Sequence, residues 1–191
     1  MICTGENHLL CQLDFDTACA GLEYIFILGR FGVDKNDAIT NTPETLNCGN
    51  WCEQSFPYYS GAVTYSRELP DLPEGKRIFL EIPHWAGSIM EININDSPVM
   101  TVGWPPESVD LTGLIKPGEK NILNIKVVSH RRNAFGPFYL KDKWTPWMGP
   151  KTFCAYETDG RKLLVPCGLL TPPVLKVAAA NVPLPPQVVC R

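Results

Sequence analysis

Apolar and polar residues alternate in short segments along most of this chain. This period of two is typical of β-strands that bury one face. Three segments show it best, and their apolar faces are Ile78, Leu80 and Ile82; Met90, Ile92 and Ile94; and Leu123, Ile125 and Val127. Because no stretch keeps apolar residues at helical spacing, we expect little helix.

Two further strands are expected near the N-terminus. The stretch "HLLCQLDF" (8–15) places Leu9, Cys11, Leu13 and Phe15 on one face. The stretch "LEYIFILGRFGV" (22–33) is apolar on both faces, which is typical of a strand covered on both sides. The polar stretch 34–50 leaves room for a short strand at Ile39 or Leu46. The stretch 61–69 places Val63, Tyr65 and Arg67 on one side.

Turn-forming residues separate these segments. Glu74-Gly75, Asn95-Asp96 and Pro117-Gly118 suit tight turns, and the last suits type II. Asp110 and Thr112 can cap a short turn that closes one end of a sandwich. With 15 Gly and 18 Pro residues in the chain, the pattern favours an all-β sandwich over a helical or βαβ fold.

The length of 191 residues fits one large domain with its own hydrophobic core. We expect residues 1–170 to form that domain. The Pro-rich stretch 171–191 reads as an extended edge segment, a linker or an interdomain brace.

The charge is nearly balanced, with 17 basic and 20 acidic residues. The densest cationic run is His130 to Arg132, so nucleic acid and membrane surfaces are not expected partners. The longest apolar run, Tyr24 to Gly29, is too short to span a bilayer and reads as a buried strand. The N-terminus lacks the features of a signal peptide. The chain is therefore expected to be intracellular, with the cytoplasm favoured if Met1 is natural, or to be a piece of something larger.

Metal and disulfide chemistry have weak signals. The 8 cysteines are expected to be mostly free thiols, although Cys48 and Cys52 are close enough for a bridge or half of a metal site. The stretch Asp34 to Asp37 offers oxygen ligands for a structural calcium ion, but a plain turn is the simpler interpretation. No cofactor is expected otherwise.

Three phrases in order carry a family resemblance: "GAVTYSRELPDLPEGKRIFLEIP", "GSIMEININDSPV" and "PPESVDLTGLIKPGEKNILNIKVV". Together they resemble the sugar-binding jelly roll, a galactose-binding-domain-like fold, of the β-galactosidase and β-glucuronidase family of glycoside hydrolases. The resemblance is strong over 59–128 and weak in the flanks, and Asp96 stands where that family usually has Gly. It implies a β-sandwich jelly roll that is not itself catalytic and accompanies a separate catalytic barrel.

The expected ligand is carbohydrate, because sugar rings stack on aromatic planes and their hydroxyls bond to Arg, Asn and His. The candidate residues lie in loop-like stretches and are His84, Trp85, Arg131, Arg132, Asn133, Trp144 and Trp147. The simpler alternative is that the aromatic rings close the ends of the sandwich or face a neighbouring domain. For the cationic loop the alternative is a solvated or interdomain position.

Catalysis by the chain itself is not expected, because no pair of carboxylates is marked for glycoside cleavage. The expectation is a carbohydrate-binding accessory module of a larger glycoside hydrolase, whose partner is carbohydrate or the catalytic domain of the same parent protein. The alternatives are a purely structural interdomain sandwich and a free-standing glycoside hydrolase.

Overall fold

The computed structural model describes residues 5–12, 14, 16, 25–135, 138–140 and 158–183. Its larger sheet is antiparallel and four-stranded. In spatial order the strands are β3 (Ala62–Glu68), β9 (Ile122–Val128), β6 (Ile89–Ile94) and β7 (Met100–Val102).

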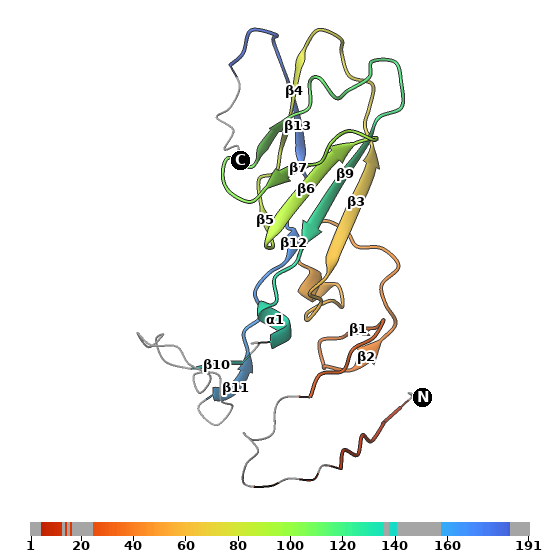
Figure 1. Ribbon diagram of the computed structural model, residues 1–191, viewed down its shortest axis with the longest axis vertical. Coiled ribbons are helices and arrows are strands. Elements are labelled where there is room, and N and C mark those ends of the chain that lie inside the picture. The colour runs from red at the N-terminus through yellow and green to blue at the C-terminus, as the bar shows by residue number, and fades with distance from the viewer. Residues whose placement is uncertain are drawn as a thin grey trace.

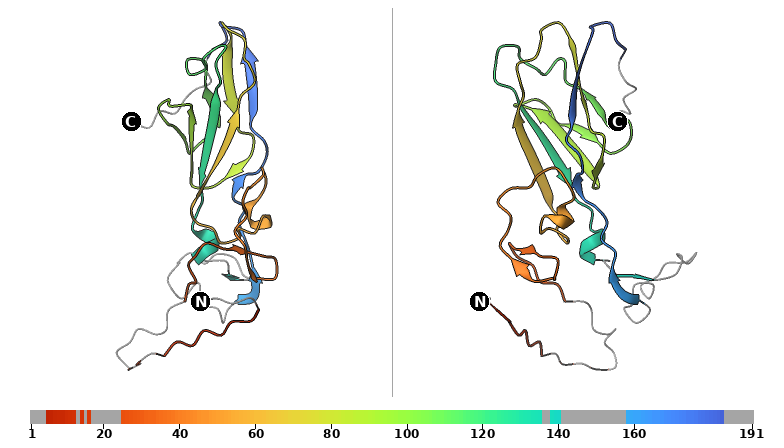
Figure 2. Two further views of the ribbon diagram at one scale, coloured as in Figure 1. Left: turned by 90° about the vertical axis from the view of Figure 1, so that its right-hand side faces the viewer. Right: turned by 180° about the vertical axis from the view of Figure 1, so that it is seen from behind.

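The second sheet is antiparallel and three-stranded, and it packs against the first as the other layer of a β-sandwich (Figure 1; Figure 2). Its strands, in spatial order, are β13 (Val174–Ala178), β4 (Arg77–Glu81) and β8 (Ser108–Asp110). Because β13 pairs along the whole length of β4, the sandwich includes part of the Pro-rich C-terminal stretch. Residues 184–191 lie outside the described part of the chain.

The core consists of the apolar faces expected from the alternation. Met90, Ile92 and Val127 are fully buried, and Leu80 and Ile82 are 1% exposed. Each such side chain contributes about 1.5–3 kcal/mol on burial, which makes these three strands the main source of stability. The expected alternation of β6 and β9 is therefore confirmed, whereas in β4 Phe79, on the face opposite Ile78 and Leu80, is buried as well.

The expected turns are also present. Gly118 has φ 71°, as position three of a type II turn requires, and the N–H of Glu119 donates to the carbonyl of Lys116 over 3.2 Å. Gly75 and Asn95 also have positive φ, 70° and 48°. Asn tolerates this region better than most residues, which explains how an Asn-Asp turn works without Gly.

The Asp110–Thr112 corner ties β8 to β4. The carboxylate of Asp110 accepts hydrogen bonds from the backbone N–H of Thr112, over 2.9 Å, and from its hydroxyl. The Thr112 hydroxyl oxygen in turn accepts the N–H of Ile78 over 3.0 Å. Leu111, between them, is fully buried, so this corner seals the core as expected.

Short elements extend below the two layers in Figure 1. They are β1 (Gly32–Val33), β2 (Ile39–Thr40), the 3-10 turn η1 (Trp51–Glu53), β5 (Trp85–Ala86), α1 (Arg132–Phe135), β10 (Phe138–Leu140), β11 (Thr158–Lys162) and β12 (Gly168–Leu169). The strands pair as β1 with β2, β5 with β12, and β10 with β11. Helix is as scarce as expected in the described residues.

Two N-terminal expectations are wrong in the described residues. Residues 5–12 form no strand, and Leu9 is 70% exposed. Residues 25–28 form no buried strand, and Leu28 is 90% exposed. Both stretches lack a neighbouring strand here, and without one an apolar run cannot satisfy its backbone inside a core. Leu13, Phe15 and Tyr24 lie outside the described residues.

Candidate functional site

The candidate residues that the structure describes gather at one end of the sandwich, where β5, β12, η1 and α1 meet (Figure 1). One returning segment, 165–171, connects them. Asn133 contacts it at Val165, Trp85 pairs with Leu169, and the carbonyl of His84 accepts the N–H groups of Leu170 and Thr171 over 3.0 and 3.2 Å. Trp144 and Trp147 lie outside the described residues.

His84 and Trp85 lie at the rim of this end of the sandwich. The His84 side chain is exposed, while its backbone holds the returning segment. Trp85 is half-buried and packs against the core from β5. The ring of Trp85 therefore closes the sandwich on one side and keeps only part of its surface open to solvent.

Asn133 is 4% exposed, and the chain's own backbone engages both ends of its amide. Its Nδ2 donates to the carbonyl of Val165 over 2.8 Å, and its Oδ1 accepts the Val165 N–H over 2.8 Å. Nδ2 also lies 3.3 Å from the Sγ of Cys52. This geometry holds the returning segment in the way a strand partner would.

The two arginines of the loop differ in their surroundings. Arg131 is exposed, and its carbonyl accepts the N–H of Phe135 within α1. Arg132 is half-buried, and burial lowers the pKa of its guanidinium. Arg131 is thus the more accessible cation for a ligand, while Arg132 lies partly against protein.

Trp51 closes the centre of the same end. It is fully buried, and its indole Nε1 donates to the hydroxyl of Tyr65 over 2.6 Å. Gly168 lies directly against the indole, and a Cβ at this position would collide with the ring. Its φ of 113° also lies in the region that favours glycine. The indole of Trp51 therefore closes this end of the sandwich from within.

A single oxygen joins η1 to the returning segment. The side-chain Oδ1 of Asn50 accepts the N–H of Cys52 and the N–H of Cys167, each over 3.2 Å. Burial, with the nearby Cys167 as second cause, raises the pKa of the Cys52 thiol to about 11. With this pKa the Cys52 thiol is neutral at ordinary pH. Nucleophilic and metal-binding chemistry require the thiolate form instead.

The residues that the sequence offered for a disulfide or a calcium ion are in other states here. Cys48 and Cys52 are not bridged to each other. The Oδ1 of Asp34 accepts the N–H groups of Asn36 and Ala38 over 2.8 and 2.9 Å, which forms the turn between β1 and β2. Asp37 pairs with Lys162. Among the described residues, no group of three His, Cys, Asp or Glu is arranged to hold a metal ion.

Carboxylates of the described strands are paired with lysines across the sheets. Lys126 lies 2.8 Å from Glu91, Lys120 lies 2.7 Å from Glu68, and Lys176 lies 2.6 Å from Glu81. All of these side chains are at least one-third exposed, so these are surface ion pairs. Such isolated pairs do not form the facing acids that glycoside cleavage requires.

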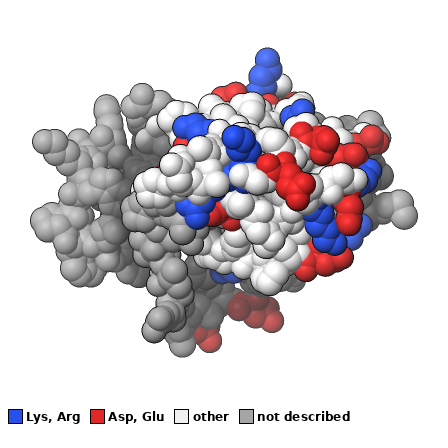
Figure 3. Space-filling view, turned by 90° about the horizontal axis from the view of Figure 1, so that it is seen from above, with Lys and Arg blue, Asp and Glu red and all other residues white. Residues whose placement is uncertain are grey.

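Acidic and basic side chains lie among one another on the end of the sandwich away from α1 (Figure 3). This face therefore carries no field of one sign. Within the described part of the chain, no helix has the length and apolar character needed to cross a membrane.

Exposed apolar side chains lie on α1 and on the stretch 25–28, which meets α1 through Phe26. They are Phe26, Ile27, Leu28 and Phe135, and we call them the α1 surface. Phe26 and Phe135 meet edge to face with their ring centroids 5.0 Å apart, yet they are 48% and 58% exposed. Ile27 and Leu28 are 57% and 90% exposed. The hydrophobic pattern did not predict this surface, because it placed the run 25–28 in the core.

No protein family model matches the chain, and no curated protein does. Part of it is similar to a beta-glucuronidase from glycoside hydrolase family 2, with 32% identity over 37% of this chain and 8% of that one, and a TM-score of 0.31. A rhamnosidase from a Novosphingobium species has 22% identity over 78% of this chain and 14% of that one, with a TM-score of 0.49. A putative beta-galactosidase from Bacteroides fragilis has 20% identity over 80% and 21%, with a TM-score of 0.42.

This chain therefore spans at most about a fifth of the length of each of these three structures. The solved structures that match part of this chain thus include members of the glycoside hydrolase family that residues 59–128 resemble.

Proposed function

We propose that this chain is a non-catalytic accessory module of a larger glycoside hydrolase, and that it braces the catalytic domain through the α1 surface. The α1 surface is the observation that carries the proposal. Contiguous exposed apolar side chains on a folded domain mark an interaction site, because leaving them in water costs free energy. Phe26 and Phe135 pack on each other and are still about half exposed, and Ile27 and Leu28, which follow Phe26 in the chain, are exposed as well.

The polar groups at the same end favour protein over sugar as the occupant. A sugar site needs side-chain donors and acceptors that are free to bond hydroxyls. The amide of Asn133 is instead engaged by Val165, and Trp85 packs partly into the core. The family resemblance of residues 59–128 supplies the identity of the occupant, since such modules accompany a catalytic barrel.

The proposal is tested first on the gene. The reading frame that contains this chain should also encode a barrel with two facing carboxylates, and a frame without one would overturn the proposal. The catalytic domain, expressed separately, should then bind this chain in calorimetric titration. The double variant Leu28→Ser, Phe135→Ser should weaken that binding at least about tenfold, whereas Val99→Ser should not. Val99 is a matched control because it is 58% exposed, like Phe135, and lies between β6 and β7.

Sugar recognition is the second candidate, favoured by the partly open indole of Trp85 and by the exposed side chains of His84 and Arg131. Titration with mono- and oligosaccharides, including uronic acids, tests it. Binding that disappears in the His84→Ala, Arg131→Ala double variant would support this candidate over the brace. Both side chains are exposed, so this variant should keep the fold intact.

A further inference from the structure

One amide oxygen holds the backbones of Cys52 and Cys167 side by side. The Oδ1 of Asn50 accepts the N–H of both residues, each over 3.2 Å, so the two backbone nitrogens lie no farther apart than twice that distance. The N–H of Trp51 also donates to the carbonyl of Cys167 over 2.9 Å, which fixes the same two stretches a second time. Disulfides join residues whose Cα atoms are about 4.4–6.8 Å apart, so this backbone spacing suits a bridge.

The two thiols also point toward the same part of the chain, the stretch 129–133 that leads from β9 into α1. The Sγ of Cys52 lies 3.3 Å from the Nδ2 of Asn133, and the Sγ of Cys167 lies 3.3 Å from the hydroxyl oxygen of Ser129. The charge of Cys167 is the second cause, after burial, of the raised pKa of the Cys52 thiol. Because such an effect weakens with distance, it also indicates that the two thiols are close.

Burial distinguishes this pair from the other nearby cysteine. Cys48 is exposed, whereas Cys52 is half-buried and Cys167 is 3% exposed. The Sγ of Cys52 lies 3.5 Å from the carbonyl oxygen of Val165, which belongs to the same returning segment as Cys167. A buried site disfavours a thiolate, and a disulfide carries no charge there. Cys167 is therefore better placed than Cys48 to bond to Cys52.

We propose that Cys52 and Cys167 form a disulfide when the chain meets a small disulfide oxidant such as oxidised glutathione. The thiolate of Cys52, the more exposed of the two, attacks one sulfur of the oxidant and expels one small thiolate. The thiolate of Cys167 then attacks the Cys52 sulfur of this mixed disulfide and expels the second small thiolate. The two released thiolates take up the protons that the cysteines lose. Two cysteines are thus oxidised by two electrons, and the oxidant is reduced to two thiols.

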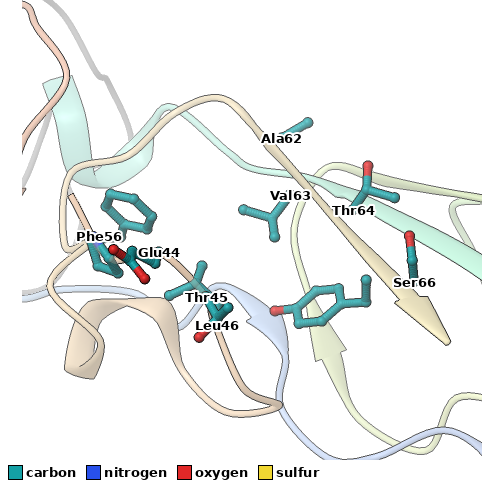
Figure 4. A pocket seen from close by; sticks show the side chains of 10 residues that line it. Glu44, Thr45, Leu46, Phe56, Ala62, Val63, Thr64 and Ser66 are labelled. Atoms are coloured by element: carbon teal, nitrogen blue, oxygen red, sulfur yellow. The ribbon is translucent and has the colours of Figure 1, made fainter.

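The bridge links η1 covalently to the returning segment. Leu46, before η1, and Phe56, after it, line a pocket of about 420 Å³ together with Val63 of β3 (Figure 4). The stretch around η1 is therefore not packed against β3 along its whole length, and a covalent bond limits its motion. Because the bond closes a loop of more than a hundred residues, it should raise the Tm of the chain by roughly 5–10 °C.

Peptide mapping of the full chain tests the proposal. The chain is reduced, refolded in a buffer of reduced and oxidised glutathione, quenched with acid and digested with chymotrypsin. Cleavage after Trp51 separates Cys48 from Cys52. Mass spectrometry should find the peptides of Cys52 and Cys167 linked as the main product, and reduction should separate them.

Thermal unfolding of variants supplies the second readout. Oxidation should raise the Tm of the parent chain and of Cys48→Ala by the same amount, and should not raise that of Cys52→Ala. Cys48→Ala is the matched control because Cys48 lies on the same stretch and is exposed. Unfolding of the reduced variants reports whether each one keeps its fold.

Three results would overturn the proposal. The first is a main product in which Cys52 is linked to Cys48 or to any other cysteine. The second is a chain in which Cys52 stays free or carries only glutathione, since Cys167 then does not reach it. The third is a gain in Tm that persists in Cys52→Ala, because another bridge would then cause it.

Discussion

The side-chain amides of Asn95 and Asn121 join two turns of the sandwich that are 26 residues apart in sequence. The Nδ2 of Asn95 donates to the Oδ1 of Asn121 over 3.3 Å, and the Oδ1 of Asn95 accepts the N–H of Ile122 over 2.8 Å. Asn121 also bonds both backbone groups of Lys116 and the carbonyl of Glu119. One buried side chain thus holds the Pro117-Gly118 turn to the turn after β6.

Asn121→Ala should lower the free energy of unfolding by roughly 2–4 kcal/mol, because it removes four hydrogen bonds of one buried side chain. Asn124→Ala is the control, since the half-buried Asn124 side chain accepts one hydrogen bond, from the Ser66 hydroxyl over 2.7 Å. It should cost about 1 kcal/mol. Urea titration measures both, and equal losses would contradict the role assigned to Asn121.

Gly168→Ala should destabilise the fold by about 3 kcal/mol or more, because the new methyl group meets the Trp51 indole and the backbone is in the left-handed region. Gly113→Ala should change stability by no more than about 0.5 kcal/mol, since a Cβ there meets open space. Thermal unfolding of the two variants compares them directly. A tolerated Gly168→Ala would mean that Trp51 does not pack against the returning segment.

Asn133→Ala should cost roughly 2–3 kcal/mol, because it removes the two bonds to the backbone of Val165. Arg131→Ala, from the same loop, should be nearly neutral because its side chain is exposed. Chemical unfolding measures the difference. A stable Asn133→Ala variant that has lost sugar binding would instead make Asn133 a ligand contact.

Asp37 should give stability that disappears in acid. Its hydrogen bond to Lys162 and, second, that to Tyr58 lower the pKa of its carboxyl in the folded chain. A lowered folded pKa stabilises above the unfolded value of about 3.9, and this stabilisation disappears as pH falls through the folded pKa. Asp37→Asn should therefore be less stable than the parent at pH 7. The difference should shrink below about pH 4 in urea titrations, and a difference independent of pH would contradict this.

The four thiols that the structure describes should differ in reactivity according to burial when the folded chain is alkylated with iodoacetamide at pH 8. Cys11 and Cys48 are exposed and should react. Cys52 and Cys167 should react only after unfolding, since burial raises the pKa of Cys52 to about 11 and Cys167 is buried. Peptide mass spectrometry distinguishes the four sites. Rapid labelling of Cys52 in the native chain would show that this end of the sandwich opens.

Local sequence signals were sufficient for the centre of the fold. The alternation of β6 and β9, the Pro117-Gly118 turn and the Asp110–Thr112 corner depend on neighbouring residues, and all three have the expected form. The prediction of a buried strand at 25–28 failed because an apolar run is buried only when another part of the protein packs against it. Its surroundings are decided by other parts of the chain or of a larger protein.

The α1 end could not be derived from local pattern. Asn133 looked like a ligand contact because Asn in a loop suits hydroxyl groups, but its partner Val165 is 32 residues away. Asn50 bonds Cys167 across 117 residues, and the requirement for Gly at position 168 comes from Trp51. Such long-range pairs leave no spacing in the sequence from which they can be recognised.

The contact between Trp51 and the segment Cys167–Leu169 also has a consequence for biosynthesis. Trp51 emerges from the ribosome long before residues 167–169. Its indole therefore stays uncovered while most strands of the two sheets are synthesised. Closure of that end then requires a loop of more than a hundred residues, which is entropically slow. The nascent chain is therefore most vulnerable to misassembly at this end, in the interval before its last strands emerge.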